Sequence, residues 1–180
     1  SMDKDDIVRE NVAENPKTGS LTLEEMAEHD AVIDVKLAAL GNPNIPTRVI
    51  HRMAAGTGKR VRETIAGNIS TPKTILMKSA RDCDTNVAYN VACNPNVPRE
   101  ALTILAERRN IGILVAVVRN KNTPEEALAK LARNNNRNLR LLIAEHENTS
   151  RETLEFLLLK AVKEADQKLA ETVRLALAKQ

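Results

Sequence analysis

A period of 26 residues runs through most of the chain. Asn42, Asn68, Asn94 and Asn120 are each 26 residues apart, and His146 takes the next position in the series. A fixed period of this size is the signature of a repeat protein, in which each unit buries its apolar face against its neighbours. The chain is therefore predicted to be an array of stacked units.

Each of these marker residues opens the same kind of turn. A small polar residue follows two places later, and proline follows four places later in every copy except the last, where Ser150 stands instead. Asparagine accepts the left-handed conformation that ends helices, and proline is favoured in a first helical turn. We therefore expect one helix to end and another to begin at each marker. The stretch TPEE predicts a capping box, with Thr123 as the N-cap and Glu126 at the third helical position.

The apolar residues between the turns follow a helical spacing. Leu102, Leu105 and Ala106 lie at i, i+3 and i+4, and the same types recur 26 residues later. After a polar loop, a second apolar set opens each time with a branched residue, at Val61, Val87, Ile113 and Leu139, and returns four residues later. Each repeat is therefore predicted to be a first helix, a loop, a second helix and a turn.

These patterns predict an all-α fold, an α–α superhelix or solenoid of about six 26-residue two-helix repeats in a single domain, residues 1–180. The predicted parts are a half repeat at 3–14, repeats at 15–41, 42–67, 68–93, 94–119, 120–145 and 146–171, and a C-terminal cap to 180. The cap is expected because the stretch EADQKLAETVRLALAK reads as one longer amphipathic helix.

The composition points to a cytoplasmic protein without a membrane segment. No apolar run approaches the roughly 18 residues that a membrane span needs, and no signal peptide is recognisable. Two cysteines suit a reducing compartment and cannot form a disulfide framework. Tyr89 and Phe156 are the only aromatic residues, so the core is expected to consist of Leu, Ile, Val and Ala.

The stretches VRETIAGNISTP, VAYNVACNPNVPREALTILAERRN and NLRLLIAEHENTSRETLEFL resemble the variant leucine-rich repeat family, a relative of the HEAT-like α-solenoids. The resemblance extends from Val8 to about Glu171 and implies an all-helical, right-handed superhelix. It implies little about function, because solenoids are scaffolds and a fold does not define an activity.

The sequence offers no recognisable catalytic set, cofactor motif or metal site. The three histidines fall at different repeat positions, and Cys83 is flanked by two aspartates that disfavour its thiolate. The stretch AAGTGKR lacks the preceding strand of a phosphate-binding loop. Enzymes on related folds that extrude a nucleobase need aromatic residues in the groove, where the central repeats offer Tyr89 alone. We therefore expect a protein that is not an enzyme and has no cofactor or metal.

The leading hypothesis is a protein-interaction scaffold that presents a groove to a protein partner or to a second copy as a homodimer. Tyr89 lies about 200° around its helix from the core residue Val87, and Val115 and Leu141 hold the same position in the next two repeats. Leu142 and Ala116 widen this stripe, while Glu63 and Gln167 occupy the position in the outer copies. The predicted partner-binding residues are Tyr89, Val115, Leu141 and Leu142. The other interpretation is that this face is buried between neighbouring repeats, and the sequence leaves both open.

The alternative hypothesis is binding to nucleic acid or another polyanion. Residues 1–41 carry 4 basic and 10 acidic side chains, whereas residues 42–145 carry 17 and 8, a net charge of +9. Repeat positions shared along the first helices predict a basic ridge, which consists of Arg52, Lys78, Arg81, Lys130 and Arg133. Such a ridge could neutralise phosphates, or it could simply keep the surface solvated. The scarcity of aromatic residues disfavours single-stranded nucleic acid, whose bases stack on aromatic rings.

Overall fold

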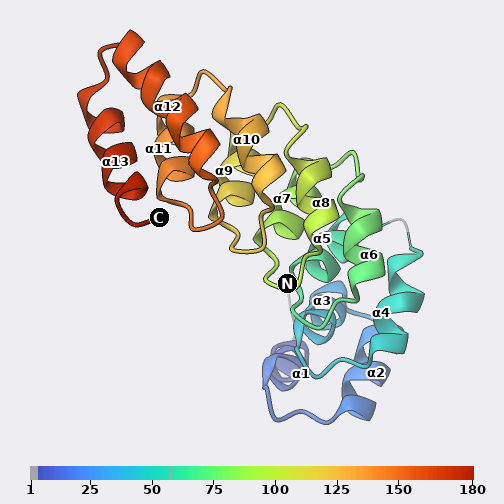
Figure 1. Cartoon of the computed structure of the whole chain (residues 1–180). Helices are drawn as coiled ribbons and strands as arrows, with labels where there is room; N and C mark the ends of the chain where they lie inside the picture. The colour runs from blue at the N-terminus through green and yellow to red at the C-terminus, as the bar shows by residue number, and fades with distance from the viewer. Residues whose placement is uncertain (1–3, 57) are drawn as a thin grey trace. The chain divides into compact units, whose positions relative to one another are not determined.

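The computed structural model describes residues 4–56 and 58–180, and consists of paired helices along its length (Figure 1). Residue 3, at the start of the predicted half repeat, and Thr57, in the loop GTG, lie outside the described residues. The first helices are α2 (Ser20–His29), α4 (Thr47–Ala54), α6 (Lys73–Ser79), α8 (Arg99–Leu105), α10 (Glu125–Ala132) and α12 (Arg151–Lys163). The second helices are α1 (Lys4–Glu14), α3 (Ile33–Gly41), α5 (Lys59–Gly67), α7 (Thr85–Cys93), α9 (Ile111–Arg119), α11 (Arg137–Glu145) and α13 (Gln167–Leu177). The predicted all-α repeat fold is confirmed.

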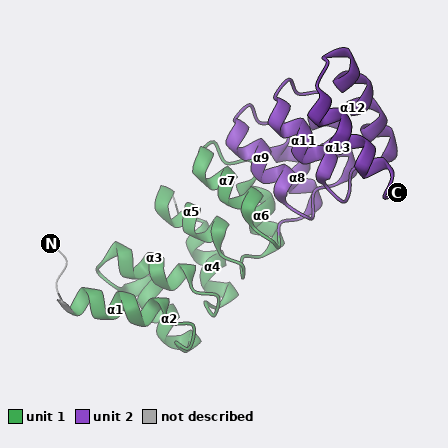
Figure 2. Cartoon of the chain, turned by 90° about the vertical axis from the view of Figure 1, so that its left-hand side faces the viewer, with its two compact units in different colours: residues 1–96 green, residues 97–180 purple. Residues whose placement is uncertain are grey.

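The helices form two compact units, residues 1–96 and residues 97–180 (Figure 2). In unit 1 the second helices α1, α3, α5 and α7 pack side by side in chain order. In unit 2 α9, α11 and α13 do the same, and α8, α10 and α12 form a parallel row of first helices. The predicted repeats from 15–41 to 120–145 each contain one first and one second helix, whereas α13 extends beyond the predicted end of the last repeat, 146–171. That all the repeats behave as a single domain stays a prediction.

The core is built from aliphatic side chains, as the composition predicted. Val87 and Val91 on α7, and Leu139 and Ile143 on α11, are fully buried at the spacing read from the sequence. Such residues pack each second helix against its neighbours, and burial of this kind stabilises by about 25 cal/mol per Å² of apolar surface.

At three turns a buried asparagine, Asn42, Asn68 or Asn94, connects consecutive repeats. Asn68 donates from Nδ2 to the carbonyls of Leu40, at 2.6 Å, and Asn42, at 3.0 Å. Its Oδ1 accepts the backbone N–H of Ser70 at 2.7 Å. Asn42 and Asn94 make the same three kinds of hydrogen bond. We call this series of side chains, with His146 as its last member, the asparagine ladder.

His146 replaces the amide with its two ring nitrogens. Nδ1 accepts the backbone N–H of Asn148 at 3.0 Å, and Nε2 lies 3.1 Å from the carbonyl oxygen of Asn120. Because Nδ1 acts as an acceptor, Nε2 must carry the proton and donate to that carbonyl. His146 therefore takes the place of an asparagine in the ladder, but it donates one hydrogen bond where an amide donates two.

The left-handed helix ends predicted at the marker residues are wrong. Asn42, Asn68 and Asn94 leave their helices in the extended conformation, with φ of −68°, −71° and −69°. The side-chain amide binds the carbonyls of the preceding repeat in this conformation, so no left-handed residue is needed. The prolines that follow, such as Pro72 and Pro98, are N-caps and precede the first helical residue.

The predicted capping box is also wrong. Pro124 is the N-cap of α10, and no side chain caps that helix. Thr123 is fully buried and donates from Oγ1 to the carbonyl of Val117 at 2.5 Å. Thr71 and Thr149 make the same bond to Ile65 and Ile143. This threonine therefore satisfies the end of the second helix and not the start of the next first helix.

The last repeat contains four extra residues. Leu169 and Val173 on α13 are buried like Leu139 and Ile143 on α11, but they follow those residues by 30 positions instead of 26. In the stretch predicted as one capping helix, residues 164–179, the helix begins only at Gln167, because the chain turns after α12 at Ala165, which has a φ of 55°. Gln167 therefore does not share the position of Leu141, as the sequence suggested; Glu171 does.

Ion pairs join some second helices to the loop of the following repeat. Three of these pairs share one repeat position: Arg9–Asp30 at 2.7 Å, Arg62–Asp82 at 2.7 Å and Arg140–Glu164 at 2.6 Å. The hydrogen bond from Arg9 is the main cause that lowers the pKa of the Asp30 carboxyl. Where Ala88 and Leu114 replace the arginine, the acidic position holds Arg108 and Asn134. Neither partner of the ion pair is therefore present at these two repeats, and on α3 the basic Lys36 stands at the arginine position while Gly56 takes the acidic one.

Candidate protein-binding surface

One position on each second helix lies on the side away from the core. We call these residues the second-helix row: they are Glu10, Leu37, Glu63 and Tyr89 in unit 1, and Val115, Leu141 and Glu171 in unit 2. Tyr89 is 45% exposed on α7. Three of its row neighbours, Glu10, Leu37 and Glu63, line a groove of about 510 Å³ that runs over α1, α3 and α5. In unit 1 Tyr89 is therefore exposed, and the half-buried Glu10, Leu37 and Glu63 line a hollow.

Carboxylates dominate the rim of this groove. Four acidic side chains and one basic side chain line it: Glu10, Glu14, Asp34, Glu63 and Arg60. Arg60 forms an ion pair with Asp34 at 2.5 Å, and Glu63 accepts a hydrogen bond from the Asn86 amide at 2.8 Å. Glu10 and Glu14 form no ion pair with any described side chain. The groove therefore has an excess of negative charge.

Lys59, at the start of α5, lies between two carboxylates. Its Nζ is 3.1 Å from Asp84 and 3.5 Å from Glu63. The hydrogen bond to Asp84 is the largest cause that raises the pKa of the Lys59 ammonium, which therefore stays charged. This bridge orients Glu63 at the edge of the groove.

In unit 2 the first two row residues are apolar but only partly exposed, whereas Glu171 is charged and exposed. Val115 on α9 and Leu141 and Leu142 on α11 are half-buried, and Ala116 is 7% exposed. The two alternatives read from the sequence, an exposed stripe and a buried face, are therefore each true in part. A groove of about 470 Å³ lies near this stretch, lined by the end of α11 and by α13 residues that include Thr172 and Leu175.

The four predicted partner-binding residues thus lie in two units, with Tyr89 in unit 1 and the other three in unit 2. That they bind a partner stays a prediction. Sequence reasoning missed the groove of unit 1, because it searched the row for apolar residues alone. The signal was available, since Glu10, Leu37 and Glu63 precede Tyr89 at intervals of 27, 26 and 26 residues.

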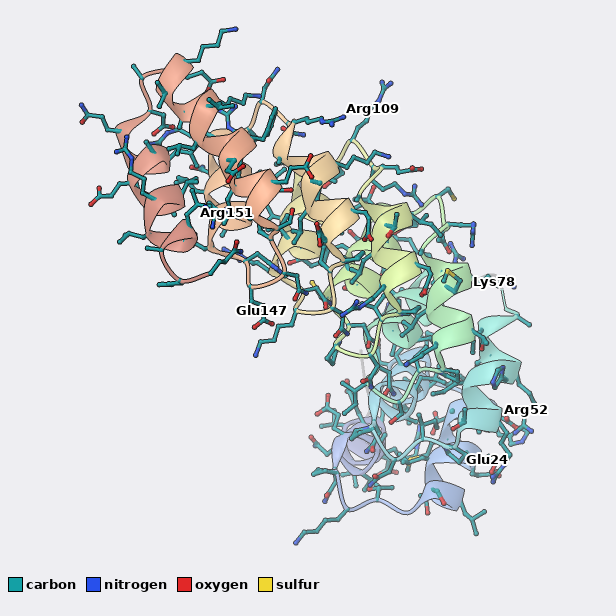
Figure 3. All side chains as sticks on the ribbon, viewed as in Figure 1. Glu24, Arg52, Lys78, Arg109, Glu147 and Arg151 are labelled. Atoms are coloured by element: carbon teal, nitrogen blue, oxygen red, sulfur yellow. The ribbon has the colours of Figure 1, made fainter. Side chains whose placement is uncertain are left out.

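The predicted basic ridge is partly neutralised. Arg52 pairs with both Glu24 and Glu28, and Lys130 pairs with Glu107 at 2.8 Å. Figure 3 shows Arg52 and Glu24 together at one edge of unit 1, with Lys78 labelled on α6. The hydrogen bond from Arg48, followed by that from Arg52, lowers the pKa of the Glu24 carboxyl, which remains ionised.

The rest of the ridge is divided between the two units. Lys78 and Arg81 are exposed in unit 1, and Arg133 is exposed in unit 2. No described acidic side chain pairs with Lys78 or Arg133. Three of the five predicted phosphate-binding residues are therefore available within the described residues.

Metal and membrane features are absent from the described parts of the chain. Across residues 4–56 and 58–180, no three His, Cys, Asp or Glu side chains gather where they could hold a metal ion. Within the same ranges no helix is both long and apolar enough to cross a bilayer. Both Cys83 and Cys93 are exposed and unbonded to each other.

No family model matches the sequence, and no curated protein matches it significantly. Among solved structures, the chain is similar to a leucine-rich repeat variant described as having a novel repetitive protein structural motif. The sequences are 26% identical and the TM-score is 0.63, with 98% of this chain and 66% of the other covered. The chain therefore spans about two thirds of the length of the solved variant.

Two designed proteins show a weaker likeness. One is a designed armadillo repeat protein, with a TM-score of 0.36, 14% identity, and coverage of 99% of this chain and 94% of that chain. The other comes from computationally designed armadillo repeat proteins for modular peptide recognition, with a TM-score of 0.34, 15% identity and coverage of 98% and 94%. We draw nothing about this chain from these two proteins, because their TM-scores are low.

Repeat folds of this kind are typical of protein-interaction scaffolds, because stacked repeats present extended surfaces. The likeness to the solved leucine-rich repeat variant extends over 98% of this chain. The resemblance to the variant leucine-rich repeat family, read first from the sequence, is thereby confirmed.

Proposed function

We propose that this chain is a non-enzymatic, cytoplasmic scaffold that binds a protein partner along the second-helix row. The observation that carries the proposal lies in unit 1, where exposed Tyr89 continues the row of half-buried residues that border a groove of about 510 Å³. An exposed aromatic side chain beside a groove is a common anchor for a protein partner, because it buries a large area at a small cost in side-chain entropy.

The charge of the groove indicates the chemistry of the partner. Glu10 and Glu14 border the groove without ion pairs to described side chains, and Arg60 balances Asp34 alone. A partner segment that carries lysine or arginine would place its charge against these carboxylates. An apolar side chain of the same segment would pack on Tyr89. We therefore expect a basic segment of a protein with an apolar residue beside it.

Binding to nucleic acid receives less support. Arg52 and Lys130, two of the five ridge residues, form ion pairs with acidic neighbours. A phosphate would have to displace those carboxylates, which reduces the net gain from counterion release.

An affinity capture from the source lysate tests the proposal. The wild-type chain, Tyr89→Asp and Leu21→Asp are used as baits, with and without nuclease, and captured proteins are quantified by mass spectrometry. Leu21 is a matched control, because it is 75% exposed in unit 1 but lies on the first helix α2. We expect proteins that survive nuclease, are lost with Tyr89→Asp and are retained with Leu21→Asp. Capture that disappears with nuclease, or that ignores Tyr89→Asp, would reject the proposal.

The role of the acidic groove has its own test. Glu10→Gln together with Glu14→Gln is expected to weaken partner capture roughly tenfold, with most of the effect present at low salt, since exposed charges are screened at high ionic strength. If the double variant captures as much partner as the wild-type chain at low salt, the partner does not bind through a basic segment. Only the contact with Tyr89 would then remain in the proposal.

A further inference from the structure

The long helix α12 (Figure 1) carries exposed apolar side chains along one side. Phe156, Leu159 and Val162 are 40%, 73% and 63% exposed. Their spacing of three residues places them on one side of the helix. The preceding repeat is charged at this surface, because Lys130 and Arg133 hold the positions of Phe156 and Leu159. An exposed apolar face on one repeat, where the preceding repeat is charged, often marks an interaction site.

Charged residues flank the apolar face with opposite signs at its two ends. Glu152 and Glu155 precede it and Lys163 follows it, and all three are exposed. Glu155, Leu159 and Lys163 are four residues apart, so they lie close to one line along the helix. Arg151 begins the same line, so its order along the chain is basic, acidic, apolar and basic, with Glu155 directly before the apolar stretch and Lys163 directly after it. Glu155 also pairs with Arg151 of its own helix, at 3.0 Å.

Such a face is complementary to itself in an antiparallel arrangement. When two copies of α12 cross at Leu159, each Glu155 lies opposite Lys163 of the second copy. Phe156 then lies opposite Val162 of the second copy, and the two Leu159 side chains meet at the centre. A two-fold axis needs this kind of pattern, in which one patch matches itself after rotation.

We propose that α12 is a dimer interface, at which a second copy of this chain packs its own α12 in antiparallel orientation. The proposal does not rest on the second-helix row or on a protein partner bound there. One pair of 13-residue helices buries less than the roughly 1,200 Å² of a standard interface, so the dimer is expected to be weak, with a dissociation constant on the order of 10–100 µM.

Sedimentation of the full chain over a range of concentrations tests the proposal. We expect a reversible monomer–dimer equilibrium that Leu159→Asp weakens more than tenfold, whereas Leu21→Asp leaves it unchanged. Leu159 and Leu21 are 73% and 75% exposed, so both variants are expected to fold. A chain that stays monomeric at the highest concentration, or a dimer that ignores Leu159→Asp, overturns the proposal.

Two further variants test the charges. Glu155→Lys and Lys163→Glu are each expected to weaken the dimer, because each brings two like charges together. Both changes in one chain are expected to restore it. A double variant as weak as the single variants would overturn the antiparallel pairing.

A disulfide test measures the orientation directly. In a chain with Cys83→Ser and Cys93→Ser, Leu159→Cys is expected to form a covalent dimer under mild oxidation. Phe156→Cys is expected to form little, because an antiparallel pair places it opposite Val162. Equal cross-linking at both positions indicates a parallel pair, and no cross-linking at position 159 indicates another occupant; either result overturns the proposal.

Discussion

The asparagine that ends a second helix forms hydrogen bonds with backbone groups of two repeats. Asn68 is 3% exposed and binds two carbonyls and one N–H group. Asn68→Ala leaves these groups without partners in a buried site. We expect it to lower the free energy of unfolding by about 2–4 kcal/mol, measured by urea denaturation.

Asn96→Ala is the matched control for this prediction. Asn96 donates to the carbonyl of Ile69 at 2.6 Å, but it is exposed, so water can replace its amide. Its replacement is expected to cost less than about 1 kcal/mol. If Asn68→Ala and Asn96→Ala lower the free energy of unfolding equally, burial of the amide does not determine how much its hydrogen bonds contribute to stability.

The last member of the ladder allows the opposite change. His146→Asn restores an amide that can donate two hydrogen bonds, where the imidazole donates one to the carbonyl of Asn120. We expect the free energy of unfolding to stay equal or to rise by up to about 1 kcal/mol, by thermal or urea denaturation. A decrease in the free energy of unfolding of more than about 1 kcal/mol would mean that the imidazole stabilises the chain by more than its hydrogen bonds in the asparagine ladder.

The period located the marker residues, but their role could not be predicted from the sequence. Asn is compatible with both a left-handed helix end and an extended conformation, and only the position of the preceding turn decides between them. Thr123 is a similar case, because its hydroxyl can cap the following helix or bind the helix before it. In both cases the partner is set by packing between repeats, which one repeat does not reveal.

At the scale of the helices, ion pairs between a second helix and the next loop make stability depend on pH. The Asp30 side chain is 8% exposed, and its hydrogen bond from Arg9 lowers its pKa. A lowered carboxyl pKa contributes stability above the unfolded value of about 3.9, and this stability is lost as the pH falls through the folded value.

Asp30→Asn isolates this contribution. The variant is expected to be less stable than the wild-type chain at neutral pH, by a margin that stays constant down to about pH 5 and shrinks below about pH 4. Urea midpoints of both chains across this range measure the margin. A margin that is unchanged or larger at the acidic end would contradict the role given to the Arg9–Asp30 pair.

In the last repeat the 26-residue period does not predict where the helices begin and end. Residues 154–162 are rich in leucine and other apolar residues. A helix of the usual length and the longer helix that forms therefore both agree with the sequence. The four extra residues become visible only when Leu169 and Val173 are seen in the core positions of α13. The same four residues caused an error in the predicted site: the sequence places Gln167 in the second-helix row, whereas Glu171 holds that position in the structure.

At the scale of the whole molecule, the predicted single domain can be tested by its cooperativity. Leu139→Ala removes a fully buried side chain of unit 2 at a cost of about 2–5 kcal/mol, and Asn68→Ala acts in unit 1. If the repeats unfold as one domain, circular dichroism in urea shows one transition that both variants shift. Two transitions, each shifted by only one of the variants, would contradict a single domain.

The scaffold proposal places the partner against the second-helix row, and site-specific photocross-linking in the source cells tests this most directly. A benzoylphenylalanine residue replaces Tyr89 on α7 or, as a control, the exposed Thr74 on the first helix α6. The account predicts a covalent product with another protein from position 89 and none from position 74. Cross-linking from position 74 alone, or equal cross-linking from both, would contradict it.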